Sequence, residues 1–162
     1  MSQITVRIAR IEDARGILEA HYSAVHETAA RDYSIEIRRA WATPVTSERI
    51  DQYLKHALPN ETTLVADVDE RIAGFGAIVE SNNELRAVYV CAEFGRQGVG
   101  SALLRELERI AKARGCRELH MDSSLTAAPF YLHHGYEETG RGVHTLSSGG
   151  KMACVRMRKA LD

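Results

Sequence analysis

Three glycines within six residues, set between an apolar stretch and a helical pattern, constrain this chain more than any other feature. The apolar stretch covers residues 85–90, the glycine-rich segment covers 95–100, and the helical pattern begins near Ser101. Glycine lets the backbone turn sharply and approach a ligand closely, because no Cβ atom stands in the way. The following helix directs its unpaired first N–H groups, and the positive end of its dipole, into the loop. The segment therefore predicts a strand–loop–helix unit that binds an anion, most often a phosphate or pyrophosphate.

Two well-known phosphate loops do not fit these residues. No Gly-Lys-Ser/Thr follows the last glycine, as a P-loop requires, and Leu103 stands where the dinucleotide-binding motif has Gly or Ala. A flexible connector between a strand and a helix is the plain alternative, because glycine-rich turns before helices are common.

Length and charge predict one domain over residues 1–162 without a nucleic-acid or membrane partner. Lys and Arg number 21 against 22 Asp and Glu, which argues against a nucleic-acid footprint or a polybasic membrane anchor. We find no signal segment and no apolar run near the ~18 residues of a membrane span. The three cysteines, Cys91, Cys116 and Cys154, form no CxxC pair and fit reduced thiols. We expect a cytoplasmic protein whose core needs neither disulfides nor a metal ion.

The spacing of apolar residues predicts a mixed α/β sheet with helices on its faces. Strands are expected near residues 4–8, 62–67, 72–80, 84–90, 118–123, 136–146 and 151–158. Helices are expected over residues 12–22, 35–41, 46–58, 101–114 and 126–134, the third of them capped by Ser47.

Residues 88–100 resemble the core motif of the GNAT superfamily of N-acetyltransferases. A second match follows at the expected distance, because residues 127–136 are similar to the family's A-x-x-F-Y-x-x-x-G-F/Y. The N-terminal residues 6–14 and the closing residues 157–161 also fit, so the resemblance spans nearly the whole chain. It implies a GNAT-like fold: a central mixed, mostly antiparallel twisted sheet flanked by helices, with a splayed strand pair at the cofactor site.

The resemblance implies acetyl-CoA as the cofactor and no metal. Backbone groups of residues 88–90 would pair with the pantetheine arm, and N–H groups of residues 96–101 would hold the pyrophosphate. The implied cofactor residues are Val88, Tyr89, Val90, Arg96, Gln97, Gly98, Val99, Gly100, Ser101 and Ser124. The chain departs from the motif at Gly95, where relatives usually have Arg or Gln, and at Ser124, where many have Asn.

Acyl transfer to an amine needs an uncharged amine, so a general base is expected. An amine with a pKa of ~10.4 costs about 4.6 kcal/mol to deprotonate at neutral pH. Glu84, at the start of the central strand, is the first candidate, and the alternative is a solvent-facing charge. His120 and Asp122 share one strand face and form the second candidate for base work or acceptor binding, with an ordinary polar face as the alternative.

The resemblance implies that Tyr131 protonates the departing CoA thiolate, although it could instead be a core aromatic. Cys91 adjoins the cofactor strand, but no His or Asp nearby in sequence would activate it as a nucleophile. Direct attack by the amine in a ternary complex is therefore the preferred mechanism.

The sequence leaves the identity of the acceptor amine open. The family's N-terminal helices usually line the acceptor side, which here carries Tyr22, His26, Tyr33 and Trp41. Tyr33 and Trp41 are predicted to bind the acceptor, and packing between helices is the alternative. A small molecule or a peptide fits equally, including an amino acid, a polyamine or an antibiotic.

Three functions are compatible with these residues. An acetyl-CoA-dependent N-acetyltransferase acting on a primary amine comes first. A non-catalytic acyl-CoA-binding sensor comes second, and an unrelated phosphate-binding interaction domain third. Edge strands in the C-terminal half are compatible with a homodimer.

Overall fold

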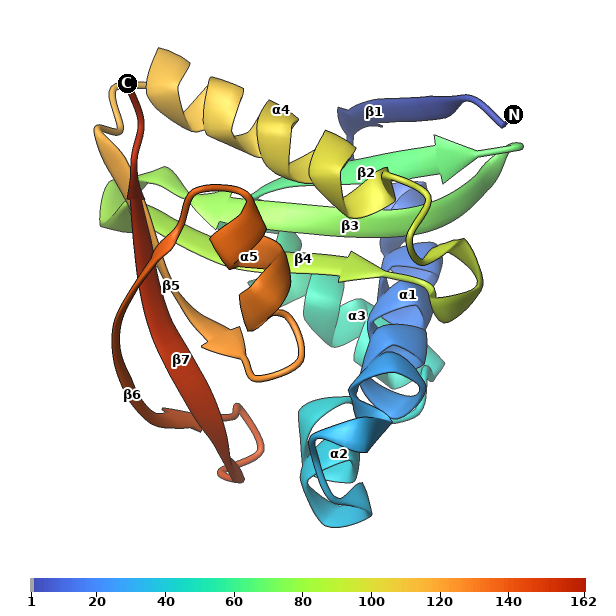
Figure 1. Cartoon of the computed structure of the whole chain (residues 1–162). Helices are drawn as coiled ribbons and strands as arrows, with labels where there is room; N and C mark the ends of the chain where they lie inside the picture. Colours follow the sequence, from blue (N-terminus) through green and yellow to red (C-terminus); the bar gives the residue numbers. More distant parts are fainter. Residues whose placement is uncertain (1) are drawn as a thin grey trace.

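Seven strands form one twisted sheet, in the order β1-β2-β3-β4-β5-β7-β6 (Figure 1). The computed structural model describes residues 2–162. The strands are β1 (Ile4–Ile8), β2 (Thr62–Val68), β3 (Arg71–Val79), β4 (Glu84–Val90), β5 (Glu118–Ser124), β6 (Glu137–Thr145) and β7 (Lys151–Ala160). Neighbouring strands pair antiparallel except β4 and β5, which are parallel. The predicted mixed, mostly antiparallel sheet is confirmed.

Helices cover both faces of this sheet (Figure 1). They are α1 (Ala14–His26), α2 (Ile35–Trp41), α3 (Ser47–His56), α4 (Val99–Ala113) and α5 (Ala128–His133). The two faces follow from alternation along a strand, since successive side chains point to opposite sides. Leu64 and Ala66 of β2 pack in the core beneath α4, whereas Val65 between them packs in the core of α1 and α3.

β4 and β5 separate soon after they meet, which opens the sheet at its centre. Their ladder contains the single pair Glu84 and His120, supported by a 2.9 Å hydrogen bond from the His120 N–H to the Asn83 carbonyl. On its other edge, β4 stays paired with β3 as far as Val90. The part of β4 that precedes the glycine loop therefore has one edge free of a neighbouring strand.

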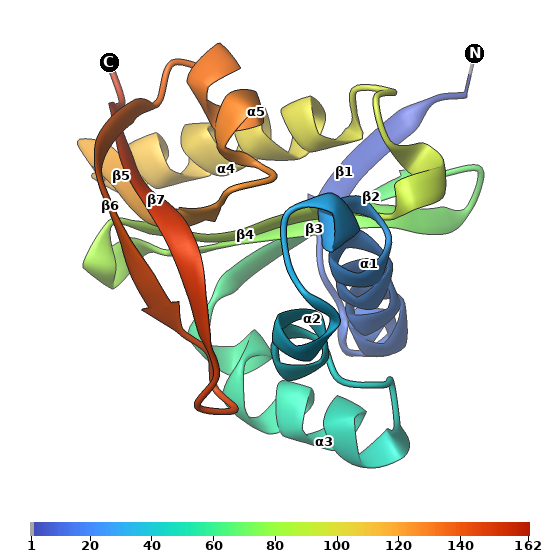
Figure 2. The same cartoon turned by 60° about the horizontal axis from the view of Figure 1, so that its bottom comes forward.

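Helix α2 lies beside α1 and faces the turn of the β6–β7 hairpin (Figure 2). The Ser148 hydroxyl in this turn donates a 2.9 Å hydrogen bond to the Ala40 carbonyl of α2. This contact joins residues 108 positions apart and holds the β6–β7 turn against α2. No helix among the described residues is long and apolar enough to cross a membrane.

The predicted start of α4 and the predicted cap of α3 were wrong. α4 begins at Val99 rather than near Ser101, because Gly98 takes a left-handed conformation (φ 88°) and serves as the N-cap. α3 is capped by Thr46 rather than Ser47: the Thr46 hydroxyl accepts a 3.1 Å hydrogen bond from the Arg49 N–H. Capping needs an extended residue just outside the helix, and Ser47 is already helical.

Candidate active site

The glycine loop presents unpaired backbone donors at the start of α4. Arg96 (φ 60°) and Gly98 (φ 88°) are both left-handed, which turns the chain tightly into the helix. The first regular helix bond runs from the Ala102 N–H to the Gly98 carbonyl over 3.0 Å. Within the described residues, the N–H groups of residues 98–101 have no hydrogen-bond acceptor. Such a set of donors at the positive end of a helix binds an anion.

A hollow of about 220 Å³ runs from this loop along the free edge of β4. Five of the predicted cofactor residues line it, namely Val88, Tyr89, Val90, Gly100 and Ser124. At Gly100 an added Cβ atom would stand 3.3 Å from the Phe130 ring, a tight contact that the ring would have to shift to relieve. The apolar walls and the adjacent donors suit a long, narrow ligand that ends in phosphates.

The other predicted cofactor residues lie in the loop and in the first turn of α4. The Gln97 amide donates to the Glu93 carbonyl at 3.2 Å, and Ser101 Oγ pairs with His134 Nε2 at 2.9 Å. Val99 is buried in the core. Since these side chains are already engaged, this part of the loop offers mainly its backbone to a ligand.

Tyr131 lies at the inner end of the hollow, beside the gap between β4 and β5. Its side chain is 5% exposed and lines both the hollow and the narrow gap. Burial raises the pKa of the Tyr131 phenol well above its ordinary value. No hydrogen bond from its hydroxyl is found among the described residues, so this buried, neutral phenol is free to donate one.

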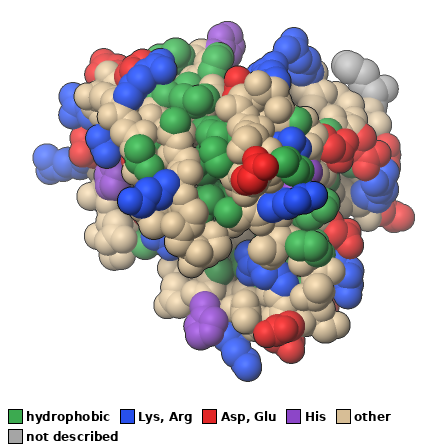
Figure 3. Space-filling view, turned by 90° about the horizontal axis from the view of Figure 1, so that it is seen from below, with side chains coloured by type: hydrophobic (Ala, Val, Ile, Leu, Met, Phe, Trp, Pro, Cys, Tyr) green, Lys and Arg blue, Asp and Glu red, His purple; other side chains and the backbone are tan. Residues whose placement is uncertain are grey.

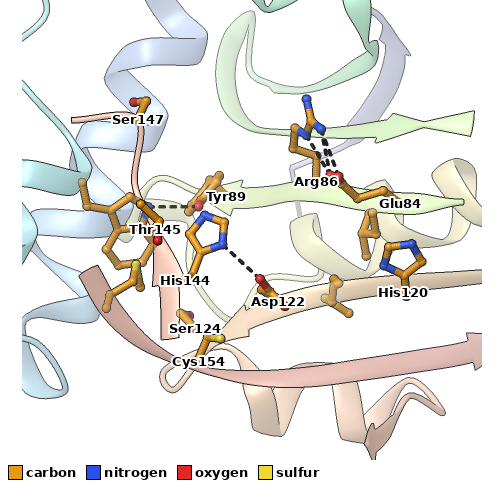
Figure 4. Close-up of a pocket in the computed structure, with 14 residues that line it drawn as sticks. Glu84, Arg86, Tyr89, His120, Asp122, Ser124, His144, Thr145, Ser147 and Cys154 are labelled. Carbon is orange, nitrogen blue, oxygen red and sulfur yellow. Dashed lines mark hydrogen bonds and ion pairs between the residues drawn. The ribbon is translucent and has the colours of Figure 1, made fainter. Parts of the chain in front are cut away.

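A second cleft, of about 560 Å³, opens at the other end of the gap (Figure 4). Glu84, His120 and Asp122 all line it, as their strand positions suggested. Glu84 is held by Arg86 at 2.8 Å, and His120 Nε2 lies 2.7 Å from the Asn82 carbonyl. Two of the predicted base candidates are thus already engaged by neighbouring groups.

Asp122 pairs with His144 of β6 rather than with His120 (Figure 4). His144 Nδ1 and Asp122 Oδ2 are 3.1 Å apart, and Arg156 Nε lies 4.0 Å from the other carboxylate oxygen. β7 separates β5 from β6, so the pair spans three strands. An imidazole oriented through Nδ1 by a carboxylate leaves Nε2 available to accept a proton.

A family model described as "Acetyltransferase (GNAT) domain" matches residues 28–161. The chain belongs to the GNAT acetyltransferase family. The match includes the glycine loop and the Phe130-Tyr131 helix, and it confirms the resemblance read from the two motifs.

Individual relatives agree with this assignment. The chain is 30% identical to the uncharacterized N-acetyltransferase YafP of Escherichia coli, over 85% of this chain and 83% of that protein. It is 27% identical to a spermidine N(1)-acetyltransferase of Thermoplasma acidophilum, over 83% and 88% of the two chains. A crystal structure of a GCN5-related N-acetyltransferase from Rhodopseudomonas palustris matches with a TM-score of 0.88 and 28% identity, covering 99% and 98% of the two chains.

The cleft of this GNAT acetyltransferase is lined by Trp41 but not by Tyr33. Tyr33 is buried behind the cleft, where its hydroxyl donates to the Ala153 carbonyl (2.6 Å) and accepts from the Leu125 N–H (2.8 Å). Trp41 packs edge-on against the Tyr33 ring. It lines both the cleft and the 220 Å³ hollow beside the glycine loop, which we call the cofactor hollow after the predicted cofactor residues that line it. The two aromatics therefore have different positions: one in the wall of the cavity and one supporting that wall.

Cys91 of the acetyltransferase lies outside the cofactor hollow and the cleft. Its Sγ donates to the Ile72 carbonyl at 3.7 Å, and burial raises the pKa of the thiol. Nothing here activates it as a nucleophile. Among residues 2–162, no group of three or more His, Cys, Asp or Glu side chains is gathered as a metal site requires.

Two lining residues of the acetyltransferase were missed by sequence reasoning. Arg86 is the ion-pair partner of Glu84, and His144 is the partner of Asp122. The spacing of Glu84 and Arg86 on one strand face could have signalled the first pair. Nothing local signals the second, because 22 residues separate its members.

Proposed function

We propose that this acetyltransferase moves an acetyl group from acetyl-CoA to a primary amine by direct attack in a ternary complex. The observation that carries the proposal is the junction of two hollows at the gap between β4 and β5, with Tyr131 beside it. A donor entering from the glycine loop and an acceptor entering from the cleft would meet there. Holding both reactants in one place lowers the entropic part of the barrier.

The cofactor hollow fits acetyl-CoA in its chemistry as well as its shape. The unpaired N–H groups of residues 98–101 suit a pyrophosphate, and the free edge of residues 88–90 suits the amide groups of a pantetheine arm. Bound there, acetyl-CoA supplies the activated acyl group. The Arg96 side chain is exposed and would contact the outer phosphates.

Tyr131 is the proposed general acid. Its phenol stays protonated at neutral pH because burial raises its pKa, and its hydroxyl has no other hydrogen-bond acceptor among the described groups. A proton given from this oxygen to the leaving sulfur would prevent a thiolate from forming in an apolar hollow, where a charge is poorly solvated.

His144, oriented by Asp122, is the proposed base. It replaces Glu84, the first candidate from the sequence. Glu84 lies at the far end of the cleft, where its carboxylate is already engaged by Arg86 at 2.8 Å. His144 stands in the same cleft and is exposed, with Nδ1 bound to Asp122. Its Nε2 would take the amine proton directly or through one water molecule.

The direct test is release of free CoA thiol from acetyl-CoA across a panel of primary amines, with calorimetric titration of CoA on the same protein. Thiol release that depends on one amine class supports transfer. Saturable CoA binding without release for any amine would favour the non-catalytic acyl-CoA sensor. Absence of CoA binding would reject both functions.

A further inference from the structure

A third hollow, of about 650 Å³, continues from the acceptor cleft beneath α2 and α3. It shares five lining residues with the cleft, namely Trp41, Arg86, Tyr89, His144 and Ser147. The third hollow therefore offers space for the far end of an acceptor that reaches the gap between β4 and β5. Figure 3 shows Lys, Arg, Asp and Glu side chains interspersed over the lower face of the molecule, so this face has no large patch of one charge. The charge that a bound ligand meets is therefore set mainly by the residues that line the hollow.

The hollow carries more positive than negative groups. Arg49 of α3 and Arg86 of β4 line it, and Glu61 is the only carboxylate among its lining residues. Glu61 is already paired with Arg86 at 3.3 Å, and Arg86 also holds Glu84. Arg86 is therefore neutralised by its two acidic neighbours.

Arg49 has no such partner. Within residues 2–162 no carboxylate lies within ion-pair distance of its guanidinium, and the guanidinium makes no hydrogen bond. The side chain is half-buried in the wall of the hollow. The nearby His21 ring stays neutral near pH 7, because burial and Arg49 lower its pKa to about 4, so it is not a charged partner for Arg49. A half-buried guanidinium with nothing to bind is a site for an oxyanion, which it can hold through two parallel hydrogen bonds.

We infer that the amine acceptor also carries a carboxylate or another oxyanion, and that Arg49 binds this group in the third hollow. The inference rests on the proposed transferase function and names the class of its acceptor. The amine end lies near His144 and the gap, and the anionic end lies at Arg49. The same unpaired guanidinium repels a polycation, so spermidine, the substrate named for the Thermoplasma acidophilum relative, is expected to be a poor acceptor here.

Trp41 allows a test that does not depend on turnover. It is the single tryptophan of the chain and lines the cofactor hollow, the cleft and the third hollow. Its fluorescence can therefore be titrated, with CoA present, using 4-aminobutyrate, 6-aminohexanoate, their carboxamides, an aminoalkylphosphonate and spermidine. We expect an acid to bind at least about tenfold more tightly than its amide, since a charged hydrogen bond is lost (about 1.4 kcal/mol per tenfold).

Variants assign the preference to Arg49. Arg49→Gln is expected to bring the acid down to the affinity of its amide, and Arg49→Lys to keep part of the preference through its charge. Arg15→Gln removes an exposed arginine of α1 that lines none of the hollows, and should change nothing. Comparison of the carboxylate with the phosphonate tells which oxyanion is bound.

Two results would overturn the inference: an equal response to acids and amides, including no response to either, or a preference that survives Arg49→Gln. Thiol release measured on the same compounds keeps the two proposals apart. A binding preference without any thiol release would support an anionic ligand at Arg49 and reject transfer. Thiol release that is as fast with alkylamines and spermidine as with the acids would support transfer and reject the anionic acceptor.

Discussion

Trp41 Nε1 donates a 3.3 Å hydrogen bond to the Tyr89 hydroxyl, joining helix α2 to the central strand where the hollows converge. Tyr89 also stacks on Phe75, and burial raises its pKa to about 12, so it remains a neutral acceptor for this bond. The two side chains line both the 220 Å³ hollow beside the glycine loop and the 560 Å³ cleft.

Tyr89→Phe should therefore loosen the acceptor wall while leaving the cofactor hollow in place. We expect the kcat/KM for the amine to fall about 5- to 10-fold, consistent with loss of one hydrogen bond of ~1 kcal/mol. The KM for acetyl-CoA should stay the same, because the backbone of residue 89 is unaltered. Tyr22→Phe, on the exposed side of α1, is the matched control. A rise in the acetyl-CoA KM alone would contradict this assignment.

Tyr131→Phe should lower kcat by about 10²-fold or more, the usual contribution of a general acid. The acetyl-CoA KM should change little, since only an oxygen atom is removed. Tyr136→Phe is the control, because Tyr136 is equally buried but directs its hydroxyl to Glu108 at 3.3 Å, outside the site. Steady-state kinetics on both variants measure this difference. An unchanged kcat for Tyr131→Phe would show that Tyr131 is not the general acid.

His144→Gln should lower kcat by about 10²-fold, and Asp122→Asn by less, because the carboxylate only orients the ring. Glu84→Gln should cost much less activity than either. The exposed His133 provides a control variant, His133→Gln, outside the cleft. If Glu84→Gln is the variant that loses activity, the first base candidate is restored and His144 is dismissed.

Gly98→Ala and Gly115→Ala separate backbone strain from cofactor binding. Both glycines are left-handed (φ 88° and 93°), and an added Cβ would meet nothing closer than 3.9 Å at Gly98 and nothing within 4 Å at Gly115. Each variant should lose about 1 kcal/mol of unfolding free energy, by the cost of a left-handed alanine. Alanine keeps the N–H group, but the strain that it adds at residue 98 would shift the donors of the loop, so only Gly98→Ala should weaken CoA binding in calorimetry. Equal CoA affinity in both variants would count against that loop.

His21 should make the protein less stable as the pH falls below neutral. Its pKa is lowered from 6.5 to about 4 in the folded chain, through burial and the charges of Arg49 and His26. Between these values the unfolded chain takes up a proton that the folded chain excludes, so stability falls as pH drops through this window. From pH 7 to pH 5 the loss is about 2 kcal/mol for this one group.

Urea unfolding at pH 7 and pH 5 measures this loss. His21→Phe should remove that part of the pH dependence, since the aromatic ring stays among Trp41 and Tyr89 without a titrating nitrogen. His56→Gln, at an exposed position, should leave the pH dependence as in the wild type. An unaltered difference between the two pH values in His21→Phe would show that His21 is not responsible.

The order of helices and strands and the position of the anion loop were predictable from the sequence. These features depend on residues close together in the chain: alternation in strands, the apolar stripe of α4 and the glycines of residues 95–100. The helix boundaries were less predictable. Thr46 and Ser47 are equally good caps by residue type, and only the backbone conformation selects Thr46.

Side-chain partnerships at the site were decided by the tertiary structure. Asp122 has His120 two residues away, yet it pairs with His144, because β7 inserts between β5 and β6 and sets their register. Tyr33 became a support for the wall, since its hydroxyl is taken by the backbone of β7 and the segment after β5.

The sequence by itself therefore determined the loop of residues 95–100, with its helix and its preceding strand, because backbone conformation follows from local residue types and their spacing. Which side chains face the acceptor was decided by packing between distant segments. The pairing of Trp41 with Tyr89, and of Asp122 with His144, together with the unpaired state of Arg49, depends on where α2, α3 and β6 dock on the sheet.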